Sequence, residues 1–193
     1  MTEHHLTTPL DSYDILELNA GDIVYLSGII FTARDEAHMR ILDLTDEGKP
    51  LPFDLDGAVL YHCGPLMQKA DGGWEAVAAG PTTSARMTEM TPALLDNYNV
   101  RAIIGKGGMK DIGPVLEGRC VYLAYTGGCA ALAVDMIKEV KGVHWLELGM
   151  PEAVWVLEVE RFGPLIVGVD AGGMDLFGEV MERAGNTFDK TFN

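Results

Sequence analysis

Hydroxyl, guanidinium and ammonium groups are concentrated in two glycine-containing segments of this sequence. Residues 80–87 read Gly-Pro-Thr-Thr-Ser-Ala-Arg-Met, and residues 105–109 read Gly-Lys-Gly-Gly-Met. Each segment follows an apolar run, so each is expected to form a turn whose backbone N–H groups point outward and attract an anion. Because Arg86 and Lys106 stand beside these groups, the expected ligand carries a carboxylate or a phosphate.

The same residues also have ordinary structural interpretations. Thr82, Thr83 and Ser84 are residue types that commonly cap a helix, and Lys106 is compatible with a solvated lysine in a flexible turn. The functional interpretation of Thr82 depends on Arg86, four residues later, because on a helix the two share one face. A guanidinium beside the hydroxyl would ease formation of an alkoxide or of a strong hydrogen bond. The 105–108 segment is not a Walker A loop, since it lacks the GxxxxGK[ST] pattern.

A third cation, Arg34, stands where a strand is expected to turn into a helix. The pair Arg34-Asp35 is compatible with a charge pattern within that helix and with an anion pocket at its start. His38 follows one turn later on the same face, so we expect it to be structural or to orient a neighbour. Cys129 follows two glycines at an expected helix start, a place that lowers a thiol pKa. A small residue packed under the turn is the simpler interpretation.

Composition limits the class of protein. The chain has 193 residues, of which 48% are hydrophobic, and a formal net charge of −15. This predicts one domain with a sizeable core and argues against nucleic acid or an anionic membrane as the main partner. Cys63, Cys120 and Cys129 form no disulfide framework and no CxxC pair, so no metal site is expected in this chain. With no signal-peptide pattern and no membrane-spanning run, we expect a cytoplasmic protein.

The order of apolar runs and turn residues predicts an α/β fold. Residues 1–20 are expected to form an N-terminal arm or an edge strand, residues 21–170 the main domain, and residues 171–193 a polar tail with one short helix. Thr91-Pro92 is expected to begin a helix with Thr91 as the N-cap. Strands are expected at residues 23–32, 58–61, 74–79, 100–104, 120–125, 153–159 and 165–169, and further helices at residues 34–42 and 129–140.

Arg34, the 82–86 segment and Lys106 each follow the end of an expected strand. In α/β sheets, ligands collect beyond the carboxyl ends of the strands. A fold that brings these ends together would converge the cations and the Thr82 hydroxyl on one pocket. Trp145, Leu146, Met150 and Trp155 are expected to serve core packing or an interface.

The two glycine segments resemble the signature segments of the class I, iron–sulfur fumarase C-terminal domain. Residues 32–38, 61–65 and 144–152 agree with the same family, and the match runs from about residue 6 to about residue 170. In many organisms this domain is a separate β subunit, and the L-tartrate dehydratase β subunit is a close relative. The resemblance implies a swivelling β/β/α domain, in which a flanking helical layer covers mixed β-structure.

The resemblance also implies a cofactor and a partner. In this family a 4Fe-4S cluster is held by three cysteines of the other domain or α subunit, and its open iron binds the substrate as a Lewis acid. The cysteines of this chain are not cluster ligands by this comparison. An α2β2 heterotetramer is the family's usual assembly.

By resemblance, the reaction is reversible addition of water across the double bond of a dicarboxylate, as in fumarate to (S)-malate. Thr82 matches the threonine proposed as the catalytic base, Arg86 and Lys106 match cations that hold substrate carboxylates, and Arg34 matches another arginine of the pocket. L-tartrate is the alternative substrate. Two interpretations of other classes stay open at this point, a non-catalytic module that binds anionic metabolites and a structural assembly subunit.

Overall fold

The computed structural model describes residues 1–70 and 72–192 and has a mixed α/β fold. Its elements in chain order are β1 (Glu3–Thr7), α1 (Ser12–Leu16), β2 (Ile23–Thr32), α2 (Asp35–Asp46), β3 (Val59–Tyr61), β4 (Leu66–Ala70), β5 (Gly73–Ala78), the 3₁₀ turn η1 (Ser84–Met87), α3 (Thr91–Asn97), β6 (Ala102–Gly105), α4 (Gly113–Leu116), β7 (Val121–Ala124), α5 (Ala130–Asp135), β8 (Ile137–His144), the 3₁₀ turn η2 (Leu146–Leu148), β9 (Val154–Val169) and α6 (Leu176–Phe192).

The main sheet closes on itself. Its strand order is β1-β2-β3-β6-β7-β9-β8, and β2 pairs additionally with β9. The strands β2, β3, β6, β7 and β9 therefore form a closed ring, with β1 and β8 attached at its outside. The pairs β2–β3, β3–β6 and β6–β7 are parallel, whereas β9 runs antiparallel to both β7 and β2. Closure removes the free edges that an open sheet would expose.

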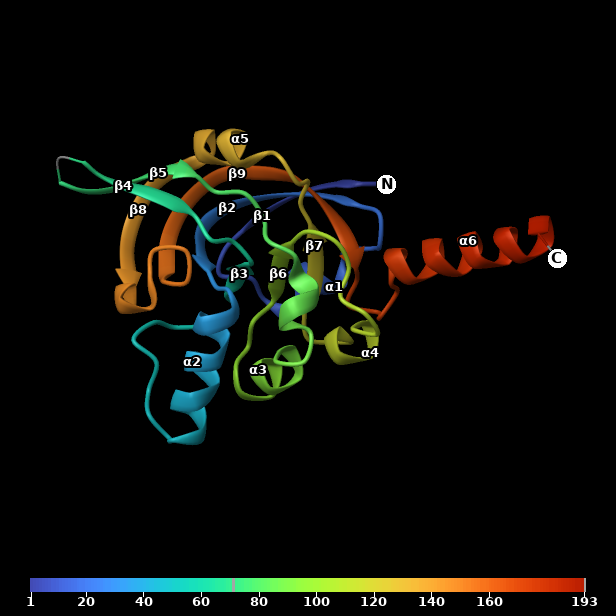
Figure 1. The fold of residues 1–193 in the computed structure, drawn as a ribbon, viewed down its shortest axis with the longest axis horizontal. Coiled ribbons are helices and arrows are strands. Elements are labelled where there is room, and N and C mark those ends of the chain that lie inside the picture. The colour runs from blue at the N-terminus through green and yellow to red at the C-terminus, as the bar shows by residue number, and fades with distance from the viewer. Residues whose placement is uncertain (71, 193) are drawn as a thin grey trace.

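Buried residues alternate between the inside and the outside of this ring. Along β3, Val59 and Tyr61 belong to one core cluster and Leu60 to a second. The first cluster fills the ring, where Tyr61, Tyr125 and Phe162 pack ring against ring. The second cluster lies between the ring and the helices α2, α3 and α4, which Figure 1 shows beside the ends of β3, β6 and β7. Because both faces of these strands are buried, the strands read as continuous apolar runs.

The parallel strands bring their carboxyl ends to one edge of the ring. β2 leads into Arg34, β3 into His62, and β6 into Lys106. The segment after β5 joins this edge through backbone bridges between Cys63 and Pro81 and between Thr83 and Lys106. The expected convergence of strand ends is therefore present, although β5 itself lies in a separate hairpin with β4.

The helix expected at residues 129–140 is wrong over its second half. Helix α5 ends at Asp135, and β8 begins at Ile137. Ile137, Val140 and Val143 pair with β9 across an antiparallel ladder. The β-branched side chains of this segment gain more from that ladder than from two further helical turns, so tertiary pairing decides the conformation.

The two strands expected at residues 153–159 and 165–169 form one strand, β9, of 16 residues. The turn-like residues between them stay in the ladder, where Phe162 pairs with Leu26 and is fully buried. Register shifts lie on either side of this pair, and Arg161 has a φ of 50°. The residues that suggested a turn therefore mark a bulge, which bends β9 as it closes the ring.

Two helix boundaries also differ from expectation. Met90, not Thr91, is the N-cap of α3, since the Thr91 hydroxyl donates to the Met87 carbonyl at 2.9 Å instead of capping the helix. The expected short helix near the C-terminus is α6, which has 17 residues and leads away from the ring (Figure 1). Within residues 1–70 and 72–192, no helix is both long enough and apolar enough to cross a membrane.

The side chain of Thr32 joins β2 to β9 just before Arg34. Its buried hydroxyl donates to the Ala153 carbonyl at 3.2 Å and accepts from the Trp155 backbone N–H at 2.9 Å. We expect Thr32→Val to keep the side-chain shape but leave both backbone groups unpaired, lowering the free energy of unfolding by about 1–3 kcal/mol. Urea denaturation measures this loss. Thr187→Val, on an exposed stretch of α6, should change stability by less than about 0.5 kcal/mol. Equal effects of the two substitutions would contradict this role of Thr32.

Candidate active site

Thr82 lies between the ends of β3 and β6 and is held there by backbone hydrogen bonds. Its N–H donates to the His62 carbonyl at 2.7 Å, and its carbonyl accepts from the Lys106 N–H at 3.2 Å. The Ser84 N–H donates to the Lys106 carbonyl at 3.2 Å. The two glycine segments singled out in the sequence are therefore joined directly. A side chain at Gly105 would overlap the Ser84 hydroxyl, so this close approach requires glycine there.

Arg86 connects the Thr82 hydroxyl to α2. Its Nη2 donates to Thr82 Oγ1 at 3.1 Å, and its Nε and Nη2 donate to the two carboxylate oxygens of Asp35, each at 2.9 Å. This fork-to-fork arrangement fixes the guanidinium plane. The hydrogen bond to Thr82 places a positive charge against the hydroxyl oxygen, the arrangement that would favour its ionised form.

Arg34 is held on the other side of Asp35. Its Nη2 lies 3.2 Å from Glu152 Oε1 and 3.8 Å from Asp35 Oδ2. Glu152 Oε2 also accepts from the Glu36 N–H at 3.1 Å, so a residue distant in sequence caps the first turn of α2. A side chain at Gly64 would lie 2.4 Å from Arg34 Nη1, so glycine makes room for the guanidinium.

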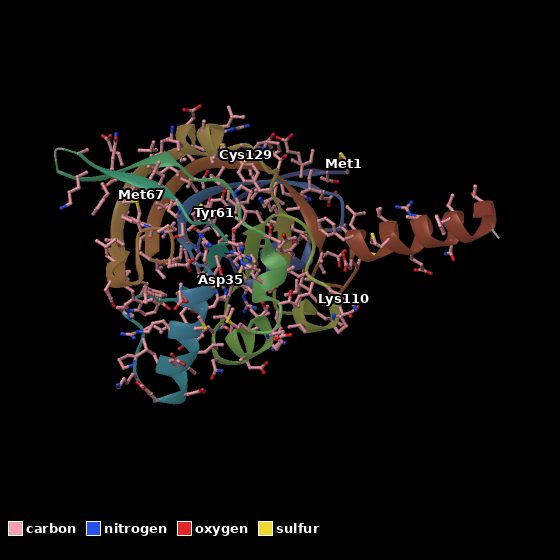
Figure 2. All side chains as sticks on the ribbon, in the orientation of Figure 1. Met1, Asp35, Tyr61, Met67, Lys110 and Cys129 are labelled. Atoms are coloured by element: carbon pink, nitrogen blue, oxygen red, sulfur yellow. The ribbon has the colours of Figure 1, made fainter. Side chains whose placement is uncertain are left out.

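Asp35 stands between two arginines at the start of α2, where Figure 2 labels it. Burial opposes its ionisation, but hydrogen bonds from Arg86 and from its own backbone N–H, with the charges of Arg86 and Arg34, hold the pKa of Asp35 below its ordinary value. Asp35 is therefore a carboxylate at neutral pH. The expected charge pattern is present as the Arg34–Asp35 ion pair, which is part of a cluster with Arg86, whereas the anion pocket stays a prediction.

A buried chain of hydrogen bonds lies behind the Thr82 and Lys106 turns. His62 Nδ1 lies 2.9 Å from Ser84 Oγ, Ser84 Oγ lies 3.1 Å from Tyr122 Oη, and Tyr122 Oη donates to the Gly107 carbonyl at 2.8 Å. The Tyr122 hydroxyl is the donor in both of its contacts, so its proton is shared between Ser84 Oγ and the Gly107 carbonyl. The tautomer of His62 decides which of Nδ1 and Ser84 Oγ donates in the contact between them. The side chains of His62, Ser84 and Tyr122 are fully buried.

His38 packs edge-on against His62, with ring centroids 5.2 Å apart. His38 Nδ1 donates to the Arg34 carbonyl at 2.9 Å, which agrees with a structural or orienting role. Burial lowers the pKa of His38; burial, followed by the charges of His38 and Arg86, lowers that of His62 well below the ordinary value of 6.5. Both imidazoles are therefore neutral at pH 7.

The capping interpretation of residues 82–84 is not supported by this geometry, whereas Lys106 as a solvated lysine stays a possible interpretation. The turn η1 begins at Ser84, and its N-cap residue Thr83 makes no side-chain capping bond. The Thr82 and Ser84 hydroxyls are used in the contacts described above. Lys106 is half-buried, and a side chain at Gly127 would lie 3.7 Å from Lys106 Cδ. Among the described residues, no carboxylate forms an ion pair with the Lys106 ammonium.

The cysteines are small buried residues. Cys129 is 4% exposed, and its thiol donates to the Thr126 carbonyl at 2.8 Å. Burial raises the pKa of the Cys120 thiol to about 12 and that of the Cys63 thiol still further. Among the side chains that the structure describes, no group of three or more His, Cys, Asp or Glu residues could hold a metal ion. The described donor set therefore does not fit an iron–sulfur cluster.

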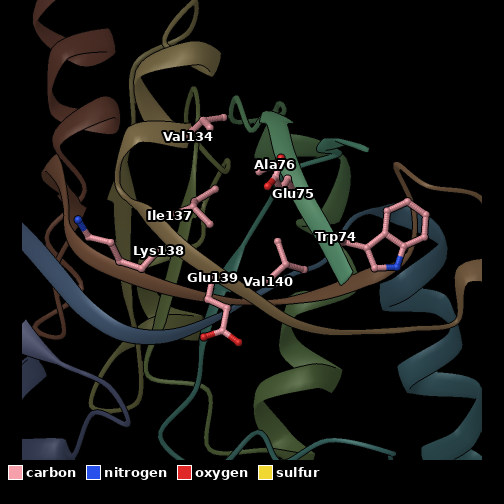
Figure 3. A pocket seen from close by; sticks show the side chains of 8 residues that line it. All are labelled: Trp74, Glu75, Ala76, Val134, Ile137, Lys138, Glu139 and Val140. Atoms are coloured by element: carbon pink, nitrogen blue, oxygen red, sulfur yellow. The ribbon is translucent and has the colours of Figure 1, made fainter. Parts of the chain in front are cut away.

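Two pockets of the molecule lie outside this cluster of cations. The one in Figure 3 lies between β5, α5 and β8, is lined by residues such as Trp74 and Lys138, and has a volume of about 320 Å³. A larger one of about 550 Å³ lies between Ala85, the turn after Lys106 and the first turns of α6. Neither is lined by the four expected site residues. The Arg34 and Arg86 side chains are instead 23% and 44% exposed, so the cluster opens to the surface.

The four expected site residues, Thr82, Arg34, Arg86 and Lys106, therefore lie together, but sequence reasoning missed the residues that hold them. Asp35 was expected to pair only with Arg34, Glu152 was part of a matching segment without an assigned role, and Tyr122 carried no signal beyond an apolar strand. Of the possible interface residues, Trp155 is fully buried in the first core cluster, and Met150 packs against that cluster. Trp145 packs against the second core cluster, whereas Leu146 is 40% exposed.

Known proteins resemble this chain over most of its length. The profile of the family described as fumarase C-terminus matches residues 2–180. A Methanocaldococcus jannaschii protein provisionally named L(+)-tartrate dehydratase subunit beta is 48% identical over 177 residues, covering 90% of this chain and 91% of that protein. The L(+)-tartrate dehydratase subunit beta of Escherichia coli K12 is 41% identical, covering 90% and 86%. A Geobacillus stearothermophilus protein provisionally named fumarate hydratase class I is 40% identical, over 91% of this chain and 34% of that protein.

The two neutral histidines make stability depend on pH. In the unfolded chain these imidazoles bind protons near pH 6.5, whereas in the folded chain they stay neutral to a lower pH. The free energy of unfolding therefore has its full value above pH 6.5 and decreases as the pH falls below it. Between pH 7 and pH 5.5 we expect a loss of about 1 kcal/mol for each histidine. Urea denaturation across this range measures it.

His62→Asn should remove about 1 kcal/mol of this pH dependence, because one buried imidazole is gone while His38 stays. The matched control is His5→Asn, since the His5 side chain is 48% exposed. A pH dependence that is the same in wild type and in His62→Asn would show that His62 is not held neutral.

Proposed function

The chain belongs to the fumarase C-terminus family, and from this premise we propose that it is the β subunit of a hydro-lyase that acts on a four-carbon dicarboxylate. The observation that carries the proposal is the 3.1 Å contact from Arg86 Nη2 to Thr82 Oγ1, beside two further cations. A dicarboxylate needs cations for both of its charged ends. Arg86, which contacts the Thr82 hydroxyl, would supply one of them, and Arg34 and Lys106 from the neighbouring strand ends would supply the others.

In this proposal Thr82 is the base. In the dehydration direction, the ionised Thr82 oxygen takes the proton from C3, and the electron pair of the C–H bond moves into the adjacent carboxylate. The electron pair then returns to form the C2–C3 double bond as the C2–O bond breaks, and the hydroxyl leaves as water with a proton from an acid of the partner. Arg86 stabilises negative charge on the Thr82 oxygen, and the cations that hold the carboxylate stabilise the charge that develops there.

The charges of the cluster suit an anionic substrate. Arg34, Arg86 and Lys106 carry three positive charges, and Asp35 and Glu152 carry two negative ones, which leaves one positive charge in a chain whose net charge is −15. Asp35 takes up the Nε edge of Arg86 and leaves Nη1 for a substrate oxygen. Lys106, which forms no ion pair within the described ranges, offers a whole ammonium group.

The exposed cluster supports dependence on a partner α subunit. Proton abstraction from carbon needs a site from which water is excluded, and this chain leaves its arginines open on one side. We propose that the α subunit covers this face and holds the 4Fe-4S cluster, because the described residues here do not fit one. When bound, the cluster would supply a Lewis acid for the C2 hydroxyl.

We further propose an α2β2 assembly, a swivelling β/β/α domain and a cytoplasmic location.

The substrate is either the pair fumarate/(S)-malate or L-tartrate. The two relatives matched along nearly their whole length are named as tartrate dehydratase β subunits, which favours L-tartrate. The relative named for fumarate hydratase is longer, and this chain corresponds to 34% of it. An anaerobic preparation of the complete αβ complex, assayed for fumarate hydration beside L-tartrate dehydration, decides between them.

Thr82→Ala should reduce turnover of the αβ complex by about 100- to 10,000-fold, the usual contribution of a positioned base. Its iron content and subunit composition should stay those of wild type. The matched control is the exposed neighbour Thr83→Ala, whose turnover should stay within about twofold. Full activity of Thr82→Ala would refute the role of this hydroxyl and favour a structural assembly subunit.

Lys106→Ala should raise KM and lower kcat together, reducing kcat/KM by about 10- to 100-fold, since a charge-assisted contact to the carboxylate is lost. Lys110→Ala is the control, because the Lys110 side chain is 91% exposed four residues away. Steady-state kinetics with both substrates measures the effect. Equal kinetics of the two variants would place the carboxylate elsewhere.

A further inference from the structure

The Thr82 and Lys106 turns are joined by few contacts. The segment from Thr82 to Ser84 contacts Lys106 through two backbone hydrogen bonds of 3.2 Å each. Lys106 is followed by Gly107, which has a φ of 70° and no side chain to pack. A turn of this kind would move easily if nothing else held it. Two side-chain contacts, at Ser84 and at Gly107, supply the additional hold.

Ser84 takes part in both kinds of contact, through its backbone and through its side chain. Its backbone N–H binds the Lys106 carbonyl, while its fully buried hydroxyl lies between His62 and Tyr122. Tyr122 comes from the neighbouring strand β7 and reaches the Gly107 carbonyl. The carbonyls of Lys106 and Gly107 are therefore held by Ser84 and Tyr122, two residues that are in contact with each other.

Each hydroxyl of this chain is held by two partners. The Tyr122 hydroxyl donates toward Ser84 Oγ and the Gly107 carbonyl, and Ser84 Oγ also lies 2.9 Å from His62 Nδ1. Burial, partly offset by the hydrogen bond to Ser84, raises the pKa of Tyr122 to about 12, so its proton stays in place at neutral pH. Within a buried network, losing one member costs more than losing a single exposed hydrogen bond.

We propose that Ser84 and Tyr122 are positioning residues that set the distance between the Thr82 hydroxyl and the Lys106 ammonium. Neither side chain touches a substrate, because both are fully buried. The link to catalysis rests on the proposed function, in which Thr82 takes the proton and Lys106 holds a carboxylate. A misplacement of about 1 Å between two such groups can cost about 100-fold in rate.

The first test is amide hydrogen exchange in the full chain, which does not depend on activity. Tyr122→Phe removes one hydroxyl and keeps the ring that packs on Phe177 at a centroid distance of 6.2 Å. We expect exchange at the Ser84 and Lys106 amides to rise at least tenfold. The Val121 amide, which binds the Arg101 carbonyl at the other end of β7, should not change. Unchanged exchange at Ser84 and Lys106 would overturn the proposal.

Tyr98→Phe is the matched control. The Tyr98 hydroxyl lies 2.6 Å from Thr45 Oγ1, between α2 and α3, and has no contact with the two turns. It should leave exchange at Ser84 and Lys106 unchanged. If Tyr122→Phe fails to fold, Ser84→Ala breaks the same chain of hydrogen bonds and replaces it in every measurement.

The second test is kinetic, in the αβ complex. Tyr122→Phe should reduce kcat/KM by about 10- to 100-fold, raising KM and lowering kcat, while Tyr98→Phe stays within about twofold. Ser84→Ala combined with Tyr122→Phe should cost little more than the worse single change, since the two act as one unit. Wild-type kinetics in Tyr122→Phe would overturn the proposal while the hydro-lyase assignment stands. A wild-type complex inactive on both substrates would remove the hydro-lyase assignment, and the exchange result would then decide the positioning alone.

Discussion

The backbone bridge between the Thr82–Ser84 segment and Lys106 is the constraint on which the candidate site depends. These residues follow different strands, and the bridge joins Thr83, just before the 3₁₀ turn η1, to Lys106, just after β6. The ends of β3 and β6 lie side by side because the two strands are parallel, and the bridge transfers that adjacency to the side chains beyond them. Because Gly105 has no side chain, the Ser84 hydroxyl can lie directly against the end of β6.

A second level of organisation comes from carboxylates that hold cations. Asp35 and Glu152 fix Arg86 and Arg34 in place, and they reduce the repulsion that three neighbouring cations would otherwise feel. The same two residues lie at the start of α2, where a negative charge is favoured by the helix dipole. A single arrangement thus stabilises a helix terminus and orients the groups that would meet an anion.

The sequence predicted the part of the site that local chemistry controls. Hydroxyls, cations and glycines at strand ends identified Thr82, Arg86, Lys106 and Arg34 as neighbours, because parallel strands make their ends converge. It did not reveal Tyr122 or Glu152, whose roles depend on which segments meet across the ring. The same limit explains the errors in the fold. Residues 137–144 become a strand because β9 offers them a partner, and residues 160–164 stay within β9 because it pairs with β2.

The closure of the ring by β9 has a consequence for how the chain reaches this fold. β2 occupies residues 23–32, yet its antiparallel partner lies at residues 156–166. During synthesis, β2 leaves the ribosome long before β9 exists, and until then one side of β2 and one side of β7 present unpaired backbone groups. Pairing across such a separation is slow, because the chain loses the entropy of closing a long loop before any stabilising contact forms. Until β9 is made, the nascent chain exposes strand edges that can pair with other chains and aggregate. We therefore expect chaperones to affect the yield of folded protein more than they affect its final stability.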